Sequence, residues 1–179
     1  MAKLMKIITI ALAILFISLV TLYLFFENKT LLATAISLGT CFYHFIMRLI
    51  VGTSINAIYH NKMNYRRRWF HVSKLENGIY KILNFKKCKR IPTYSPDSFS
   101  SKLHSFEEIL EASCQAEVVH EIIFVLSFLP IVFALLFGEF YVFLSTSIVA
   151  SLIDLFFIMV QRSKRSTLIK FVIKHQKYI

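Results

Sequence analysis

The chain has 179 residues, of which 56% are hydrophobic, and it carries a formal net charge of +11 at pH 7. Its mean hydropathy of +0.62 is too apolar for a soluble domain of this size and predicts an all-α, multi-pass membrane protein. The excess of basic residues could indicate nucleic-acid binding. However, these residues stand beside apolar segments, where they set topology and meet anionic headgroups. We therefore expect membrane lipids as partners and no nucleic acid.

The first predicted membrane span covers residues 4–26, in which the apolar run after Lys6 is long enough to cross a bilayer. A cleaved secretory signal is the alternative interpretation. The run is longer than the apolar core of such a signal, usually about 7–15 residues, and no Ala-x-Ala site immediately precedes Glu27 at its end. We therefore expect an uncleaved membrane anchor.

A second span is predicted at residues 31–52, after a short turn at residues 27–29. It carries Cys41, His44 and Arg48, which share one helical stripe because they are three and four residues apart. These side chains are candidates for one wall of a polar site. Alternatively, Arg48 extends toward the headgroups and His44 bonds a neighbouring helix.

Residues 53–110 are predicted to form an amphipathic, basic and aromatic loop outside the hydrocarbon. In residues 65–71, the sequence Tyr-Arg-Arg-Arg-Trp-Phe-His interleaves cations with aromatic rings. Rings at headgroup depth and cations beside phosphate are typical of a segment lying on a membrane surface. A solvated loop that only obeys the positive-inside rule is the other interpretation.

A helix is predicted to begin near the end of this loop, where Ser105 and Glu108 form a capping box. It continues into the third span, residues 116–137, and Pro130 is expected to kink it. A tight turn at Gly138 and Glu139 then leads to the fourth span, residues 140–160.

The fourth span carries polar residues at helical spacing, and these are Ser147, Ser151, Asp154 and Gln161. They fall on one face of the predicted helix, which we expect to be buried. Basic residues flank the first span at Lys3 and Lys6, fill the central loop, and recur in the tail, residues 162–179, whereas the opposite turns contain only Lys29. This distribution predicts one membrane domain, residues 1–179, in the cell membrane with both termini in the cytoplasm.

Ionisable side chains within these spans are costly to bury and are the candidate site of the protein. With the predicted topology they lie in the cytoplasmic half of the membrane, where Arg48 can pair with Asp154 or a glutamate, and His120 with Glu117 or Glu111. The candidate catalytic residues are therefore His44, Arg48, Glu111, Glu117, His120 and Asp154. We expect them to form one shared polar pocket.

A histidine held by a carboxylate can act as a general base near neutral pH, and Arg48 could stabilise a developing negative charge. Glu117 and His120 also have the Glu-x-x-His spacing of carboxylate metal sites, but a full site needs more ligands, so no metal is assigned. A buried ion network that only fixes helix packing is the third interpretation. No Gly-x-Ser-x-Gly motif and no Gly-rich phosphate loop is present in the sequence.

Several segments resemble one family of small bacterial membrane proteins. They are Glu111-x-x-Cys114-x-Ala116-Glu117-Val118-Val119-His120, Lys86-Lys87-Cys88-Lys89, Pro130-Ile131 and Val160-Gln161-Arg162. These motifs are similar to those of the glycosyl-4,4'-diaponeurosporenoate acyltransferase family, which esterifies the sugar of a carotenoid glycoside with a fatty acyl chain. The sequence departs from the family pattern at Cys88, where the family has tryptophan, and after Arg162.

The resemblance implies transfer of a fatty acyl group to a hydroxyl of a lipid-like acceptor, a carotenoid glycoside or a related glycolipid. It implies no cofactor beyond an acyl donor: acyl-CoA, acyl carrier protein or a lipid. The residues expected to hold the donor are Lys86, Lys87, Lys89, Gln161, Arg162 and Arg165. A non-catalytic scaffold that stabilises the membrane and a metal-dependent lipid-modifying enzyme are the alternative functions, and the sequence leaves the oligomeric state open.

Overall fold

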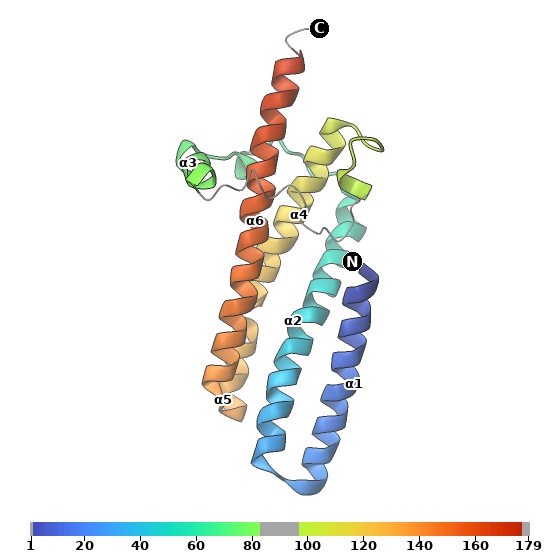
Figure 1. Cartoon of the computed structure of the whole chain (residues 1–179), viewed down its shortest axis with the longest axis vertical. Helices are drawn as coiled ribbons and strands as arrows, with labels where there is room; N and C mark the ends of the chain where they lie inside the picture. Colours follow the sequence, from blue (N-terminus) through green and yellow to red (C-terminus); the bar gives the residue numbers. More distant parts are fainter. Residues whose placement is uncertain (1, 83–96, 177–179) are drawn as a thin grey trace. The chain divides into compact units, whose positions relative to one another are not determined.

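The computed structural model describes residues 2–82 and 97–176, and these residues form helices and connecting turns without strands (Figure 1). The all-α prediction is therefore confirmed. The α-helices are α1 (Ala2–Phe26), α2 (Lys29–Tyr59), α3 (Lys74–Ile82), α4 (Phe106–Leu126), α5 (Ala134–Phe137) and α6 (Phe140–Gln176).

Among the described residues, four segments are long and apolar enough to cross a membrane: Lys3–Phe26, Lys29–Tyr59, Phe106–Phe137 and Phe140–Lys170. The four predicted spans are confirmed, and the chain is a multi-pass membrane protein. Two of the helical segments, Lys29–Tyr59 and Phe140–Lys170, continue well beyond the predicted spans, and the third begins at Phe106, where its helix was predicted to begin. Apolar composition marks only the length that hydrocarbon requires, whereas a helix continues through polar residues as long as its backbone ladder is uninterrupted.

Two turns separate consecutive spans where local residues permit them. Asn28 accepts a hydrogen bond from the Thr30 amide at 2.8 Å, at the start of α2. Gly138 and Glu139 both have positive φ, 71° and 48°, between α5 and α6. The predicted tight turn at these two residues is therefore confirmed, and the glycine supplies a backbone conformation that most residues avoid.

Pro130 does more than kink the third span. The α-helix α4 ends at Leu126, and Pro130 lies in the first turn of a 3₁₀ helix, Leu129–Phe133, that leads into α5. Proline has no amide hydrogen and its ring collides with the preceding turn, so it favours the start of a new helical segment over the interior of an old one.

The central loop contains more regular structure than the sequence predicted. α2 runs to Tyr59, and a 3₁₀ turn at Arg68–Phe70 and the helix α3 follow it. The predicted capping box is present before α4, where Ser105 N donates to Glu108 Oε2 at 2.8 Å. A second capping box precedes α3, where Ser73 N donates to Glu76 Oε2 at 2.7 Å and Glu76 N donates to Ser73 Oγ at 3.1 Å.

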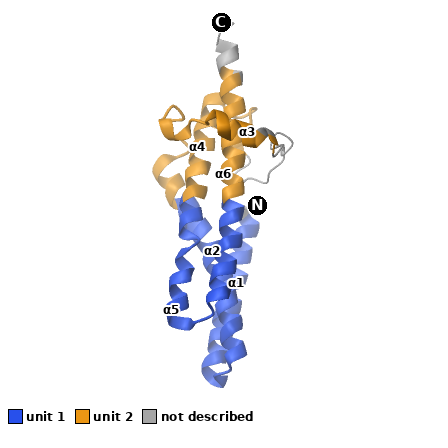
Figure 2. Cartoon of the chain, turned by 90° about the vertical axis from the view of Figure 1, so that its left-hand side faces the viewer, with its two compact units in different colours: residues 1–53, 122–154 blue, residues 54–121, 155–179 orange. Residues whose placement is uncertain are grey.

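The fold divides into two compact units, residues 1–53 with 122–154 and residues 54–121 with 155–179 (Figure 2). Unit 1 contains the apolar lengths of the spans, and in it Phe16 stacks on Phe42 at 6.3 Å between ring centroids. Unit 2 contains the central loop and the polar ends of α4 and α6. Its small apolar core groups Met63, Phe70 and Cys114. The single domain expected from the sequence stays a prediction.

Candidate functional site

Glu117 is the most deeply buried carboxylate of unit 2, with no exposed side-chain surface. Its Oε2 accepts a hydrogen bond from Arg165, which is itself 1% exposed, and its Oε1 accepts one from Arg162 Nη1 at 3.1 Å. α4 supplies the glutamate, and α6 supplies both arginines from positions three residues apart, so both point to one side of their helix. We call Glu76, Glu117, Glu121, Arg162 and Arg165 the Glu117 cluster.

The two arginines also hold the central loop by its backbone. Arg165 Nη2 donates to the carbonyl of Phe70 at 2.9 Å, and its guanidinium lies 5.1 Å from the centroid of the Phe70 ring. Arg162 Nη2 lies 3.4 Å from the carbonyls of Trp69 and His71. Three successive residues of the loop are therefore fixed by side chains of α6, because guanidinium groups present several donors in a fixed plane.

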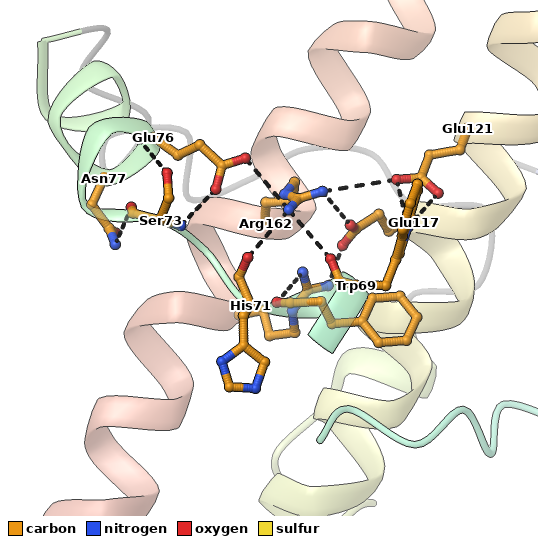
Figure 3. Close-up of polar contacts among 10 residues, drawn as sticks. Trp69, His71, Ser73, Glu76, Asn77, Glu117, Glu121 and Arg162 are labelled. Atoms are coloured by element: carbon orange, nitrogen blue, oxygen red, sulfur yellow. Dashed lines mark hydrogen bonds and ion pairs between the residues drawn. The ribbon is translucent and has the colours of Figure 1, made fainter. Parts of the chain in front are cut away.

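Two further carboxylates approach Arg162 from opposite sides, as Figure 3 shows. Glu76 of α3 lies 3.4 Å from it and Glu121 of α4 lies 3.9 Å from it. The Trp69 indole nitrogen donates to Glu121 Oε2 at 2.9 Å. The Glu117 cluster therefore joins α3, α4, α6 and the 3₁₀ turn through charge-assisted bonds.

Neutral polar contacts extend this arrangement through unit 2. Gln161 is buried and accepts a hydrogen bond from Ser113 Oγ at 3.1 Å. Gln115 Nε2 donates to the side chains of Asn56 and Asn61 at 3.1 and 2.9 Å. Burial beside Val160 raises the pKa of the Tyr80 hydroxyl above its ordinary value.

His120 lies one turn after Glu117 on α4 and is partly exposed. Its ring stacks on Phe157 of α6, with centroids 4.9 Å apart and 13° between the ring planes. Glu111 is nine residues earlier on the same continuous helix, about 14 Å along its axis, so it is too far away to orient the imidazole. Of the two carboxylates predicted to hold His120, Glu111 is thus excluded by helix geometry, and Glu117 is bonded by two arginines.

Unit 1 contains a second charged pair, between Arg48 of α2 and Asp154 of α6. Arg48 also donates to the carbonyl of His44 at 2.9 Å and to that of Ala150 at 3.3 Å. Asp154 and His44 are both buried, at 0% and 5% exposure. The predicted pairing of Arg48 with Asp154 is confirmed, and we call His44, Arg48 and Asp154 the Asp154 cluster.

The structure thus distributes the predicted catalytic residues over two clusters. His44, Arg48 and Asp154 belong to unit 1, whereas Glu111, Glu117 and His120 belong to unit 2. The common pocket expected to join all six stays a prediction. The four polar residues of the fourth span are buried as expected: Ser147, Ser151, Asp154 and Gln161.

The residues predicted to hold an acyl donor differ in their exposure and in their existing bonds. Lys86, Lys87 and Lys89 lie outside the described residues. Gln161 and Arg165 are buried and already bonded, whereas the side chain of Arg162 is 16% exposed. Arg66, Arg67 and Arg68 are exposed on the loop and are better placed to meet an external phosphate.

Sequence reasoning missed the α3 helix and the loop carbonyls that bind the arginines. The Ser-x-x-Glu pattern at Ser73 and Glu76 is the signal that could have revealed the helix. No sequence signal points to the backbone carbonyls of residues 69–71, since every residue has one. Within the described parts of the chain, no group of three His, Cys, Asp or Glu side chains is arranged to hold a metal ion.

Comparison with known proteins identifies one family. The family model described as glycosyl-4,4'-diaponeurosporenoate acyltransferase matches residues 66–174, more than half of the chain. The matched region contains the whole Glu117 cluster, His120 and Asp154, while His44 and Arg48 precede it. No curated protein and no solved structure matches the chain.

Proposed function

The chain belongs to the glycosyl-4,4'-diaponeurosporenoate acyltransferase family, and from this premise we propose that it transfers a fatty acyl group to a hydroxyl of a membrane-resident, lipid-like acceptor. The match over residues 66–174 is the observation that carries the proposal. The four apolar helices support it, because such an acceptor resides in the bilayer. A carotenoid glycoside or a related glycolipid is the proposed acceptor.

His120 is the proposed general base. It is the partly exposed histidine of the matched region that lies beside Glu117, and its ring plane is fixed by Phe157. In the proposed step, a ring nitrogen takes the proton of the acceptor hydroxyl as the oxygen attacks the acyl carbonyl carbon of the donor. The bond to the leaving thiolate or alkoxide then breaks, and the imidazolium returns the proton to that leaving group.

The Glu117 cluster supports this base by fixing its surroundings. Glu117 binds Arg165 and Arg162, which in turn hold the carbonyls of residues 69–71 against α6. We assign Glu117 and Arg165 to positioning the loop, because buried and mutually bonded charges are not available to a substrate phosphate. Arg162 retains some exposure and is the member of this cluster proposed to meet the donor.

The donor itself is proposed to be held from the loop side. Arg66, Arg67 and Arg68 are exposed, and exposed cations meet phosphates or anionic headgroups readily. Acyl-CoA, acyl carrier protein and a donor lipid each carry the negative charge that such a surface attracts. Lys86, Lys87 and Lys89 remain proposed contributors to the same role.

The orientation in the membrane is proposed from charge. Basic residues lie at the start of α1, in the central loop and at the end of α6. The spans separate them from the turns at residues 27–28 and 138–139, whose charged residues are Glu27 and Glu139. The positive-inside rule then places both termini and the donor-binding loop in the cytoplasm, with the cell membrane as the proposed location.

Replacement of the proposed base tests this function. We expect His120→Gln to lower the rate of acyl transfer to a glycosylated carotenoid by about 10²-fold or more, as loss of a general base does. The assay uses purified protein in lipid nanodiscs, with acyl-CoA and acylated carrier protein offered as alternative donors. His104→Gln is the matched control, since His104 is an exposed histidine outside the cluster. An unchanged rate in His120→Gln would remove His120 from the mechanism.

One observation favours a second candidate, a non-catalytic membrane scaffold. Each carboxylate oxygen of Glu117 is already bonded by an arginine, which is what a purely structural network requires. Extraction of lipids and pigments from a deletion strain separates the two functions. A missing acylated glycolipid supports the enzyme, whereas an unchanged lipid profile supports the scaffold.

A further inference from the structure

His44 is buried without a hydrogen bond to its imidazole. His44 is 5% exposed, and neither nitrogen of its imidazole ring has a partner among the described residues. Ser147 of α6 is in the same condition, because it is 0% exposed and its hydroxyl has no partner in the described chain. Leaving such groups unpaired in an apolar environment costs roughly 1–3 kcal/mol each, so two of them in one unit indicate a missing partner.

The two unpaired groups belong to α2 and α6, and each is within about one turn of a residue that Arg48 binds. These helices run in the same direction (Figure 1), and Arg48 joins them by donating to the carbonyls of His44 and Ala150. His44 is therefore level with the part of α6 around Ala150. Ser147 lies one turn before Ala150, on the buried stripe that also contains Ser151 and Asp154.

The charges of this region define what it can bind. Arg48 is paired with Asp154, so the cluster has no net charge to offer an anion or a cation. A neutral imidazole presents one donor and one acceptor, and a serine hydroxyl can be both. The complementary partner is a neutral group that also donates and accepts, which is a hydroxyl.

We propose that His44 and Ser147, beside the Arg48–Asp154 pair, bind a hydroxyl of the uncharged sugar headgroup of a membrane lipid. The Arg48 side chain is 18% exposed, so the cluster is open to its surroundings at that point. The exposed face of α6 is apolar in this region, as a lipid-facing surface requires, and its residues include Val149, Leu152 and Ile153. That this lipid is the acyl acceptor rests on the proposed function, whereas its binding by His44 and Ser147 does not.

Binding is measured without an acyl donor, so that its result is independent of acyl transfer. Purified protein in nanodiscs of phosphatidylglycerol is given either monoglucosyl diacylglycerol or diacylglycerol with the same acyl chains. Native mass spectrometry of the protein released from the discs then reports the fraction that retains each lipid. We expect the wild-type protein to retain the glucosyl lipid about tenfold better, the equivalent of one or two hydrogen bonds.

Two variants and one control assign the binding to these residues. His44→Phe and Ser147→Ala are each expected to lower retention of the glucosyl lipid by roughly five- to tenfold and to leave diacylglycerol unchanged. Ser145→Ala is the control, because Ser145 is exposed on the same helix and bonds its own backbone. Ser147→Ala is the smaller change in side-chain volume. If His44→Phe does not fold, retention of the glucosyl lipid by Ser147→Ala alone tests the site. Equal retention of the two lipids by the wild-type protein, as expected if water alone fills the site, overturns the proposal.

Discussion

The two charged clusters differ in the groups that compensate their buried carboxylate. In unit 2, Glu117 is bonded by two arginines, and these arginines hold three consecutive loop carbonyls as well. In unit 1, Asp154 is paired with Arg48, and the neighbouring His44 and Ser147 have no hydrogen-bond partner among the described residues. In the first cluster, Arg162 Nε and Arg165 Nε have no partner among the described residues, but the Nη atoms of both guanidinium groups are bonded to Glu117 and to the loop. In the second, both ring nitrogens of His44 are unpaired, so this side chain has no polar bond to the described chain.

This difference teaches that a buried charge is not by itself a sign of catalysis. The sequence drew attention to Glu117, yet its contacts are those of a positioning residue. Buried polar atoms without a hydrogen-bond partner are a more useful guide to a binding site. Their burial costs free energy, and a bound ligand can supply the hydrogen bond that the chain does not. Arg162 and Arg165 each lack a partner only at Nε, whereas the whole imidazole of His44 and the hydroxyl of Ser147 are unpaired, which makes these two side chains the candidates for contact with a substrate headgroup.

The largest expected effect is on the Glu117 cluster. Glu117→Gln removes the negative charge that compensates two buried or half-buried guanidinium groups, so we expect a loss of about 3–5 kcal/mol of stability. Thermal melting in detergent micelles measures it. The control is Glu111→Gln on the same helix, which should change stability by less than about 0.5 kcal/mol. Equal melting of Glu117→Gln and the wild-type protein would contradict the structural role of the cluster.

Double replacements sharpen the comparison of the two pairs. Arg48→Met with Asp154→Leu removes both charges of the pair, and the two carbonyls that Arg48 also binds, those of His44 and Ala150, remain within the backbone ladders of α2 and α6. The double variant should therefore recover to within about 1 kcal/mol of the wild-type stability, although each single variant loses about 3 kcal/mol or more. Glu117→Leu with Arg165→Met should not recover, since the Phe70 carbonyl and Arg162 lose their partners too. Thermal melting in detergent micelles measures these changes. Recovery of stability in both double variants would show that the two clusters do not differ in this respect.

Two glycines of α2 test packing in unit 1. A Cβ on Gly39 would lie 2.7 Å from the Phe16 ring, whereas a Cβ on Gly52 meets nothing within 4 Å. We expect Gly39→Ala to cost about 1 kcal/mol through overpacking, and Gly52→Ala to gain about 0.5 kcal/mol because alanine favours helices. Melting curves of the two variants should therefore shift in opposite directions. Stabilisation by both replacements would show that Phe16 moves aside freely.

The smallest expected effect is on the loop of unit 2. Ser73→Ala removes the cap of α3 and should cost about 0.5–1 kcal/mol locally, since an orphan amide loses its acceptor. Hydrogen exchange of the amides of residues 74–82 measures the change more directly than melting does. Ser100→Ala, outside any capping box described here, should leave this exchange unaltered, and faster exchange in both variants would argue against the cap.

Much of the fold could be predicted because it depends on local composition and period. Apolar runs of sufficient length gave the four spans, and helical spacing placed Asp154, Ser147 and Ser151 on one buried stripe. The C-terminal limits of α2 and α6 were underestimated, since hydropathy does not report where polar residues continue a helix, whereas the capping box correctly predicted the start of α4. The short helix α3 escaped notice because its residues carry no long apolar pattern, and only the capping box at Ser73 and Glu76 marks its start.

The sequence by itself determined that this protein is helical, crosses the membrane four times and resembles one acyltransferase family, because chain composition and short motifs are enough for those conclusions. Only the tertiary structure decided that Glu117 pairs with Arg165 and Arg162, that the loop binds through its carbonyls, and that His44 and Ser147 are left unpaired. A carboxylate or an imidazole can bond many partners. Which one it bonds depends on the side chains that distant segments bring within about 3 Å.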